Sequence, residues 1–199
     1  MPQTPVSAAI AFDAQTTCLQ HALDLIDQVH SDGALPVIAI SELPADDGRL
    51  GIFSLDEPII QISAPSKNTF AFVHEIGHLI DHKGLGANNF ASKNYKNNEL
   101  SGWFNAVEKS QTYKLLHHNY SGNTGLRGVV KYLLQPEELW ARCYSQWIAT
   151  KTLDQTLLNE LWKYQNSNNF ITKSFHWSDD EFRPIARKIE TLFSAKGWI

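Results

Sequence analysis

The segment from His74 to His78 holds the residues best suited to chemistry, since it reads His-Glu-Ile-Gly-His. On a helix, histidines four residues apart lie on one face, so both imidazoles can bind one metal ion. Glu75 lies beside them, where it can reach a water on that ion without binding the ion itself. With only two cysteines in the chain, histidines and carboxylates are the expected ligands. The pattern predicts a Zn²⁺ site with Glu75 as its general base.

Apolar residues around this segment indicate how it is placed. Val73, Ile76 and Ile80 form a stripe typical of a helix that packs on a sheet, which leaves the histidine pair facing a cleft. The alternative is a surface helix with two solvated histidines.

Two histidines do not complete a catalytic zinc site, which uses three protein ligands and a water. The best candidate for the third ligand is Glu138, near the start of a predicted helix. Its face of that helix continues through small side chains, namely Ala141, Ser145 and Ala149. Small side chains allow a close approach to the histidine helix, where Gly77 also removes bulk. The neighbouring Glu137 has bulkier residues on its face, and we interpret it as stabilising the helix N-terminus.

Other polar residues receive lesser roles. His82 falls on the same helix face as His78, but one straight helix does not curl three successive turns around a single ion. Asp81 is expected to orient a ligand histidine or to tie down the helix end. Arg142 is expected to pair with Asp81, the alternative being contact with a substrate carboxylate. The remaining histidines receive no assigned chemistry: His21, His30, His117, His118 and His176.

These segments together resemble a known family. Residues 72–82 are similar to the active-site helix of zincin metallopeptidases of the glutamate-ligand (gluzincin) type. With Glu138-x-x-Ala141-x-x-Tyr144 added, the chain resembles the catalytic domain of anthrax lethal factor and related phage and polymorphic-toxin zincins. Residues 51–82 also resemble the repressor-cleaving ImmA/IrrE-type peptidases. The resemblance is confined to residues 50–82 and 130–150.

The resemblance implies a metal site and an oxyanion group. In that family the Glu of the comparable helix is the third zinc ligand, which assigns the metal to His74, His78 and Glu138. A tyrosine ahead of this Glu stabilises the oxyanion, a role that falls here to Tyr132. The alternative for Tyr132 is an ordinary tyrosine on an amphipathic helix.

The implied function is a zinc-dependent endopeptidase that hydrolyses a protein or peptide substrate, with Glu75 taking the proton of the attacking water. One alternative is a regulatory protease of the ImmA/IrrE type that cleaves a repressor. Another is a catalytically silent zincin-fold binding or phage structural module. The intact His74, Glu75 and His78 favour the enzyme, since loss of the base is typical of a silent site.

The elements that must position these residues can be read from periodicity. Helices are predicted over residues 16–31, 66–82, 136–150, 153–165 and 180–196, and strands over 35–40, 49–55 and 58–63. This pattern predicts an α+β, zincin-like fold, with a small, mostly antiparallel sheet on the histidine helix and a helical C-terminal half. The strand at 58–63 is expected to bind an extended peptide by strand addition.

The organisation expected is one zincin-like metallopeptidase domain over residues 1–199. Within it, residues 1–15 read as a flexible arm. Residues 84–125 are rich in Asn and Gly, residues that compete with regular structure, and read as an excursion over the cleft.

Composition excludes other classes of function. The formal net charge is −4 and no long basic run occurs, so no nucleic-acid partner is expected. No apolar run is long enough for a membrane-spanning helix, so no membrane association is expected. No Lys or Arg precedes Arg49, which argues against a secretory signal or transit peptide. The expected location is cytoplasmic, with delivery by a phage or a non-Sec secretion route left open.

Overall fold

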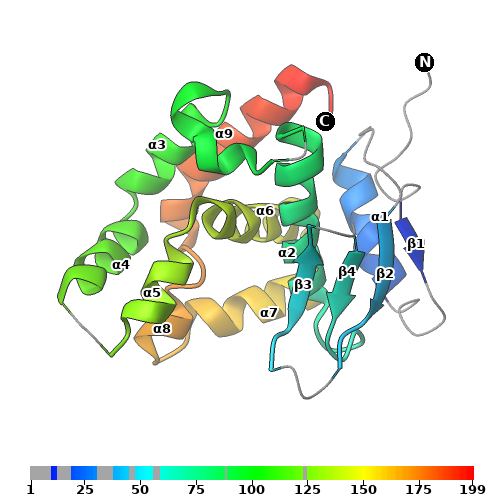
Figure 1. Ribbon diagram of the computed structural model, residues 1–199, viewed down its shortest axis with the longest axis horizontal. Helices are drawn as coiled ribbons and strands as arrows, with labels where there is room; N and C mark the ends of the chain where they lie inside the picture. The colour runs from blue at the N-terminus through cyan, green and yellow to red at the C-terminus, as the bar shows by residue number, and fades with distance from the viewer. Residues whose placement is uncertain are drawn as a thin grey trace.

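The computed structural model describes residues 10–12, 19–30, 38–44, 48–55, 59–87, 89–122 and 125–199. A small sheet lies at one side of a larger helical part, which makes the fold α+β as expected (Figure 1). In chain order the elements are β1 (Ile10–Phe12), α1 (Gln20–Val29), β2 (Ile38–Glu42), β3 (Gly51–Ser54), β4 (Ile59–Ile62), α2 (Thr69–Leu79), η3 (Ile80–Leu85), η4 (Ala91–Asn97), α3 (Ser101–Lys109), α4 (Gln111–Gly122), α5 (Arg127–Leu133), α6 (Pro136–Thr152), α7 (Gln155–Gln165), α8 (Phe170–Lys173) and α9 (Asp179–Lys196).

The described strands form one sheet in the order β1-β2-β4-β3. The β1–β2 and β2–β4 pairs are parallel, and only β3 and β4 run antiparallel. The expectation of a mostly antiparallel sheet is therefore wrong, although it holds for the last two strands. The strand that pairs with β2 is β4, and the two run parallel. The β3–β4 hairpin therefore places β3 at an edge of the sheet.

The position of β4 also changes where a peptide could add to the sheet. Because β4 pairs with β2 on one side and with β3 on the other, its backbone groups are already used. Addition of a peptide to β4, expected from the sequence, is therefore ruled out. Among the described strands, β3 is the edge next to α2.

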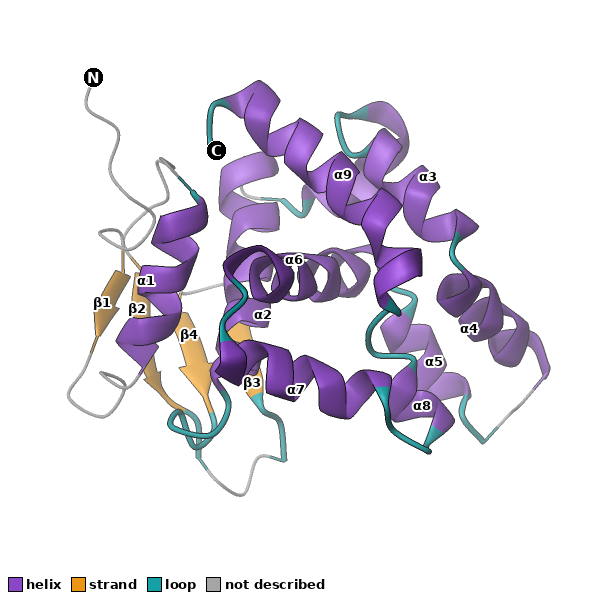
Figure 2. Ribbon diagram, turned by 180° about the vertical axis from the view of Figure 1, so that it is seen from behind, coloured by secondary structure: helices purple, strands orange, loops and turns teal. Residues whose placement is uncertain are grey.

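Helices α1 and α2 cover the same face of the sheet (Figure 2). Side chains alternate across a strand, so one face of β2 and β4 supplies apolar side chains to the core. These strand residues are Ile38, Ile40, Ile60 and Ile62, all buried. The helices meet them with Leu19, Leu23, Ile26, Val73 and Ile76, which are also buried. The predicted apolar stripe on the histidine helix thus faces the sheet.

Helix α6 runs through the middle of the helical part, with α2 between it and the sheet (Figures 1 and 2). Every residue from Glu138 to Ala149 is buried, as expected of a helix packed on all sides. The approach of α2 and α6 is close: a Cβ added at Gly77 would lie 2.9 Å from Ala141 Cα. Trp140 also donates its indole N–H to the Gly77 carbonyl at 3.1 Å. Of the small residues singled out in the sequence, Gly77 and Ala141 meet between these two helices, with Tyr144 beside them.

Two expected segments differ from the structure. Residues 10–12, placed in a flexible arm, form β1 and pair with β2; the rest of the expected arm lies outside the described residues. The described residues of the 84–125 segment are mainly helical, through η4, α3 and α4, more so than its Asn and Gly content predicts. The described Asn and Gly residues lie at helix ends, in turns and inside helices. Helices form here because packing of residues such as Trp103 and Phe104 against the core outweighs the weak helix propensity of Asn and Gly. Among the described helices, none combines the length and apolar character that crossing a membrane requires.

Candidate metal centre and adjoining cavity

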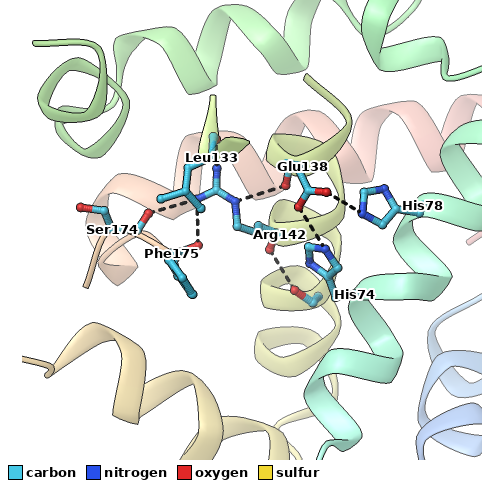
Figure 3. Close-up of polar contacts among 8 residues, drawn as sticks. His74, His78, Leu133, Glu138, Arg142, Ser174 and Phe175 are labelled. Carbon is cyan, nitrogen blue, oxygen red and sulfur yellow. Dashed lines mark hydrogen bonds and ion pairs between the residues drawn. The ribbon is translucent and has the colours of Figure 1, made fainter. Parts of the chain in front are cut away.

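Three predicted ligand residues meet between α2 and α6. His74 and His78 lie one turn apart on α2, and Glu138 lies in the first turn of α6. The Glu138 carboxylate reaches both rings, with Oε2 3.4 Å from His74 Nε2 and Oε1 3.2 Å from His78 Nε2 (Figure 3). One ligand atom from each residue lies within 4.8 Å of the others. The structure thus brings together the two histidines and the distant glutamate chosen from the sequence.

Two distances within this group are close to those of a zinc ligand set. Neighbouring ligand atoms around a tetrahedral zinc ion, with bonds of about 2.0–2.2 Å, lie about 3.3–3.6 Å apart. The two imidazole–carboxylate distances of 3.4 and 3.2 Å are close to that spacing. Glu138 is 7% exposed, so its carboxylate is largely shielded from solvent. Two histidines and one glutamate, with a position left for water, are the donors of a known class of catalytic zinc site.

The charges within the group also favour a cation. Burial acts to raise the pKa of Glu138, but hydrogen bonds and charge from His74 and His78 bring it below its usual range. Burial acts to lower the pKa of His78, but Glu138, Glu75 and Asp81 together hold it above its ordinary value. The carboxylate therefore stays ionised and attracts positive charge, so a bound cation would compete with a proton on His78.

Glu75 is buried next to this group, under the edge strand. A backbone hydrogen bond from Phe53 of β3 reaches its carboxylate. Gly51 makes room for it, because a Cβ there would lie 2.8 Å from both Glu75 Cγ and Oε1. Burial raises the pKa of Glu75, while charges on His74 and His78 act in the opposite direction. A raised pKa suits a group that must accept and release a proton near neutral pH.

A cavity of about 480 Å³ opens beside His74 and Glu75. It runs along α2 toward Phe70 and Ala71, which lie one turn before His74 and Glu75. Other elements complete the wall with Gly48, Arg49, Leu50, Gly51, Tyr132, Leu133, Glu138, Arg142, Tyr164, Phe175 and His176. The lining contains no described residue of the 84–125 segment, the segment that was expected to lie over the cleft. Instead Phe90 packs against His78 and His82, with ring centroids 5.8 and 5.2 Å apart.

Tyr132, the predicted oxyanion group, lines the cavity from α5 and is 48% exposed. Burial of its ring, together with the charge of Glu138 and a hydrogen bond to that carboxylate, raises the pKa of Tyr132 above its usual range. The phenol therefore stays protonated and can donate a hydrogen bond. Tyr132 and the proposed ligand Glu138 are neighbours in the structure.

Two other acidic residues are placed by their contacts. Glu137 points away from the histidines and pairs with Lys93 at 2.8 Å. Asp81 accepts hydrogen bonds from the backbone N–H and the hydroxyl of Ser92, at 2.8 and 2.5 Å, so it ties down the end of the helix. Of the two roles expected for Asp81, these bonds support the one at the helix end.

The expected ion pair between Arg142 and Asp81 is absent from the described contacts. The buried Arg142 guanidinium donates instead to the backbone carbonyls of Leu133, Ser174 and Phe175 (Figure 3). Its Nε–H donates to the carbonyl of Glu138, one turn earlier on α6. Arg142 therefore joins two segments of the cavity wall, at Leu133 and Phe175, to the helix that carries Glu138.

The remaining histidines separate into distant and nearby ones. His21 contacts Asp154 at 2.9 Å, His30 contacts Tyr144 at 3.1 Å, and His117 and His118 line a different surface depression. His82 is buried but is not part of the ligand group.

His176 is the residue that sequence reasoning missed, because it lines the cavity from a loop nearly one hundred residues away from the motif. Nothing in its spacing relates it to the motif.

Comparisons with protein-family models, with curated proteins and with solved structures found no match.

Proposed function

We propose that this chain is a zinc-dependent endopeptidase whose metal is held by His74, His78 and Glu138. The convergence of these three side chains from two helices, with one ligand atom of each within 4.8 Å of the others, carries the proposal. Glu75 beside the group and a cavity next to both supply the other requirements of hydrolysis, a base and a place for substrate.

Each residue then has a defined task. A zinc ion held by these three residues would supply Lewis acidity and would lower the pKa of a water to about 7. Glu75, with its raised pKa, would take a proton from the attacking water and pass it to the leaving amine. Tyr132, protonated and at the rim of the cavity, donates a hydrogen bond to the developing oxyanion.

The substrate backbone has a natural partner in β3. This strand is the described edge of the sheet next to α2, and its Gly51 and Phe53 adjoin Glu75. An extended peptide that adds to this edge would pass the base and the ligand group. The proposal therefore moves strand addition from β4 to β3.

The test combines metal analysis with cleavage of an unfolded protein. The wild-type chain should bind one zinc ion and cleave the substrate, and a chelator should stop cleavage. Glu75→Gln should keep zinc but lose at least about a hundredfold in rate, as expected for loss of a general base.

Glu138→Ala and Glu137→Ala form a matched pair on adjacent residues. The first removes a proposed ligand and should abolish stoichiometric zinc binding. The second removes the ion pair with the exposed Lys93 but no residue of the ligand group, so it should leave zinc binding and cleavage intact. Absence of zinc binding by the folded wild-type chain, or full hydrolysis by Glu75→Gln, would contradict the proposal.

A further inference from the structure

The cavity has an aromatic wall. Phe70, Tyr164, Phe175 and His176 all line it. His176 packs edge-on against Phe70, with ring centroids 5.0 Å apart, and lies 5.1 Å from Tyr164. The ring centroid of Tyr164 lies in turn 5.7 Å from that of Phe175. A wall of this kind suits a flat, largely apolar side chain.

His176 is the polar exception in this wall. It is 5% exposed, and its Nδ1 is buried without a hydrogen-bond partner among the described residues. Since Nδ1 is shielded and the ring lines the cavity, Nε2 is the nitrogen available to a ligand. Burial, with added effects of Arg142 and His74, holds the pKa of His176 well below its ordinary value. The neutral ring can donate or accept one hydrogen bond toward the cavity.

The backbone on both sides of His176 is fixed by buried polar side chains. Arg142 binds the carbonyls of Ser174 and Phe175, at 3.0 and 3.1 Å. The Gln146 side chain binds both the carbonyl and the N–H of Trp177, at 2.9 and 3.1 Å. The loop that presents His176 is thus held to α6, the helix that also carries Glu138. Such support is what a preorganised binding group needs.

We propose that His176 makes this cavity selective for a tyrosine side chain, over phenylalanine, next to the cleaved bond. The inference rests on the proposed peptidase function and adds its substrate class. A phenylalanine ring would fill the aromatic wall but would exclude water from the His176 ring and leave its nitrogen unpaired. A tyrosine makes the same ring contacts and pairs its hydroxyl with that nitrogen. A site built to hydrogen-bond a hydroxyl discriminates against the analogue that lacks it.

The test uses two peptides that are identical except for one central Tyr or Phe. Binding is measured by calorimetry with the zinc-loaded, full-length Glu75→Gln protein, so that no turnover is needed. Cleavage of the same peptides is measured with the wild-type chain. One additional hydrogen bond predicts about a tenfold preference for the Tyr peptide, both in Kd and in kcat/KM.

His176→Phe is the main variant, because it keeps a ring against Phe70 and Tyr164 while removing the nitrogen. It should lose the preference for Tyr and bind the Phe peptide at least as tightly as before. His176→Gln, which keeps a hydrogen-bonding group, should retain part of the preference. Thermal unfolding of each variant checks that the fold is kept.

Two results would overturn the inference. One is equal binding of both peptides by the protein with His176 intact. The other is a loss of kcat for both peptides in His176→Phe with their ratio unchanged, which would place His176 at the reacting carbonyl. Binding selectivity without any cleavage by the wild-type chain would instead contradict the peptidase function while supporting the pocket.

Discussion

At the scale of single residues, the position of the Glu75 carboxylate depends on the absence of a side chain at Gly51. Gly51 faces it from β3, and the backbone of the same strand hydrogen bonds to its carboxylate at Phe53. Since Glu75 has a flexible side chain, a methyl group at Gly51 would displace the carboxylate rather than the strand. The position of the proposed base is therefore set by a glycine that the sequence motif does not include.

We expect Gly51→Ala to reduce kcat by at least about tenfold, because even a displacement of about 1 Å at a reacting group is costly. Zinc binding should be kept, since the ligands lie on other residues. The measurement is steady-state hydrolysis together with zinc stoichiometry. Gly102→Ala on α3 is the control, because its Cβ would meet only Lys188 Cδ at 3.7 Å, and it should leave activity unchanged. Unchanged kcat in Gly51→Ala would show that Glu75 is not held by β3.

At the scale of elements, the distance between α2 and α6 decides whether a metal site can form. Two ligands lie on α2 and the third on α6, so their spacing follows the helix–helix spacing. Gly77 and Ala141 permit the close contact, and Trp140 fixes it through the Gly77 carbonyl. A small change between the helices therefore affects stability and metal affinity together.

Gly77→Ala should destabilise the fold by about 1–3 kcal/mol, because the added methyl group meets the backbone of Ala141. It should also weaken zinc binding at least about tenfold, by moving Glu138 away from the histidines. Urea unfolding of the metal-free chain and competition with a chelator measure the two effects separately. Unchanged zinc affinity in a destabilised variant would show that the ligand geometry does not depend on the contact between α2 and α6.

At the scale of the whole molecule, a buried histidine joins distant parts of the chain. His30, at the end of α1, contacts Tyr144 of α6 through Nε2 and the Trp198 carbonyl through Nδ1, at 3.1 and 3.2 Å. Burial lowers its pKa to about 4, outweighing the opposing effects of the Trp198 carbonyl and Asp27. The imidazole is thus neutral in the folded chain at pH values where it is charged in the unfolded chain.

This difference makes stability depend on pH in a defined direction. Below the ordinary pKa of 6.5 the unfolded chain binds a proton at His30 that the folded chain refuses until about pH 4. The contribution of His30 to stability is therefore complete above this range and is lost as the pH falls, by about 2 kcal/mol between pH 7 and pH 5.

His30→Gln, which cannot take up a proton, should show a smaller loss of stability than the wild type over the same interval. Urea unfolding of both proteins at pH 7 and pH 5 gives the comparison, and the difference between them removes the contributions of the other titrating groups. Identical losses in the two proteins would mean that His30 is not the group responsible.

The sequence by itself determined the parts that depend on local spacing. The interval between His74 and His78 places both rings on one face of any helix, and the small residues after Glu138 identify the face that can approach them. The apolar stripes of α1 and α2 were equally readable, because a helix repeats its faces every few residues.

Only the tertiary structure decided which distant segments meet. The pairing of β4 with β2 left β3 as the edge beside Glu75, which no property of the strand sequences specified. Arg142 bound backbone carbonyls that all residues share, so its partners could not be read from residue types. His176 reached the cavity through a loop fixed by those bonds. Local spacing is set by the geometry of one helix, whereas contacts between remote segments depend on how all the elements pack together.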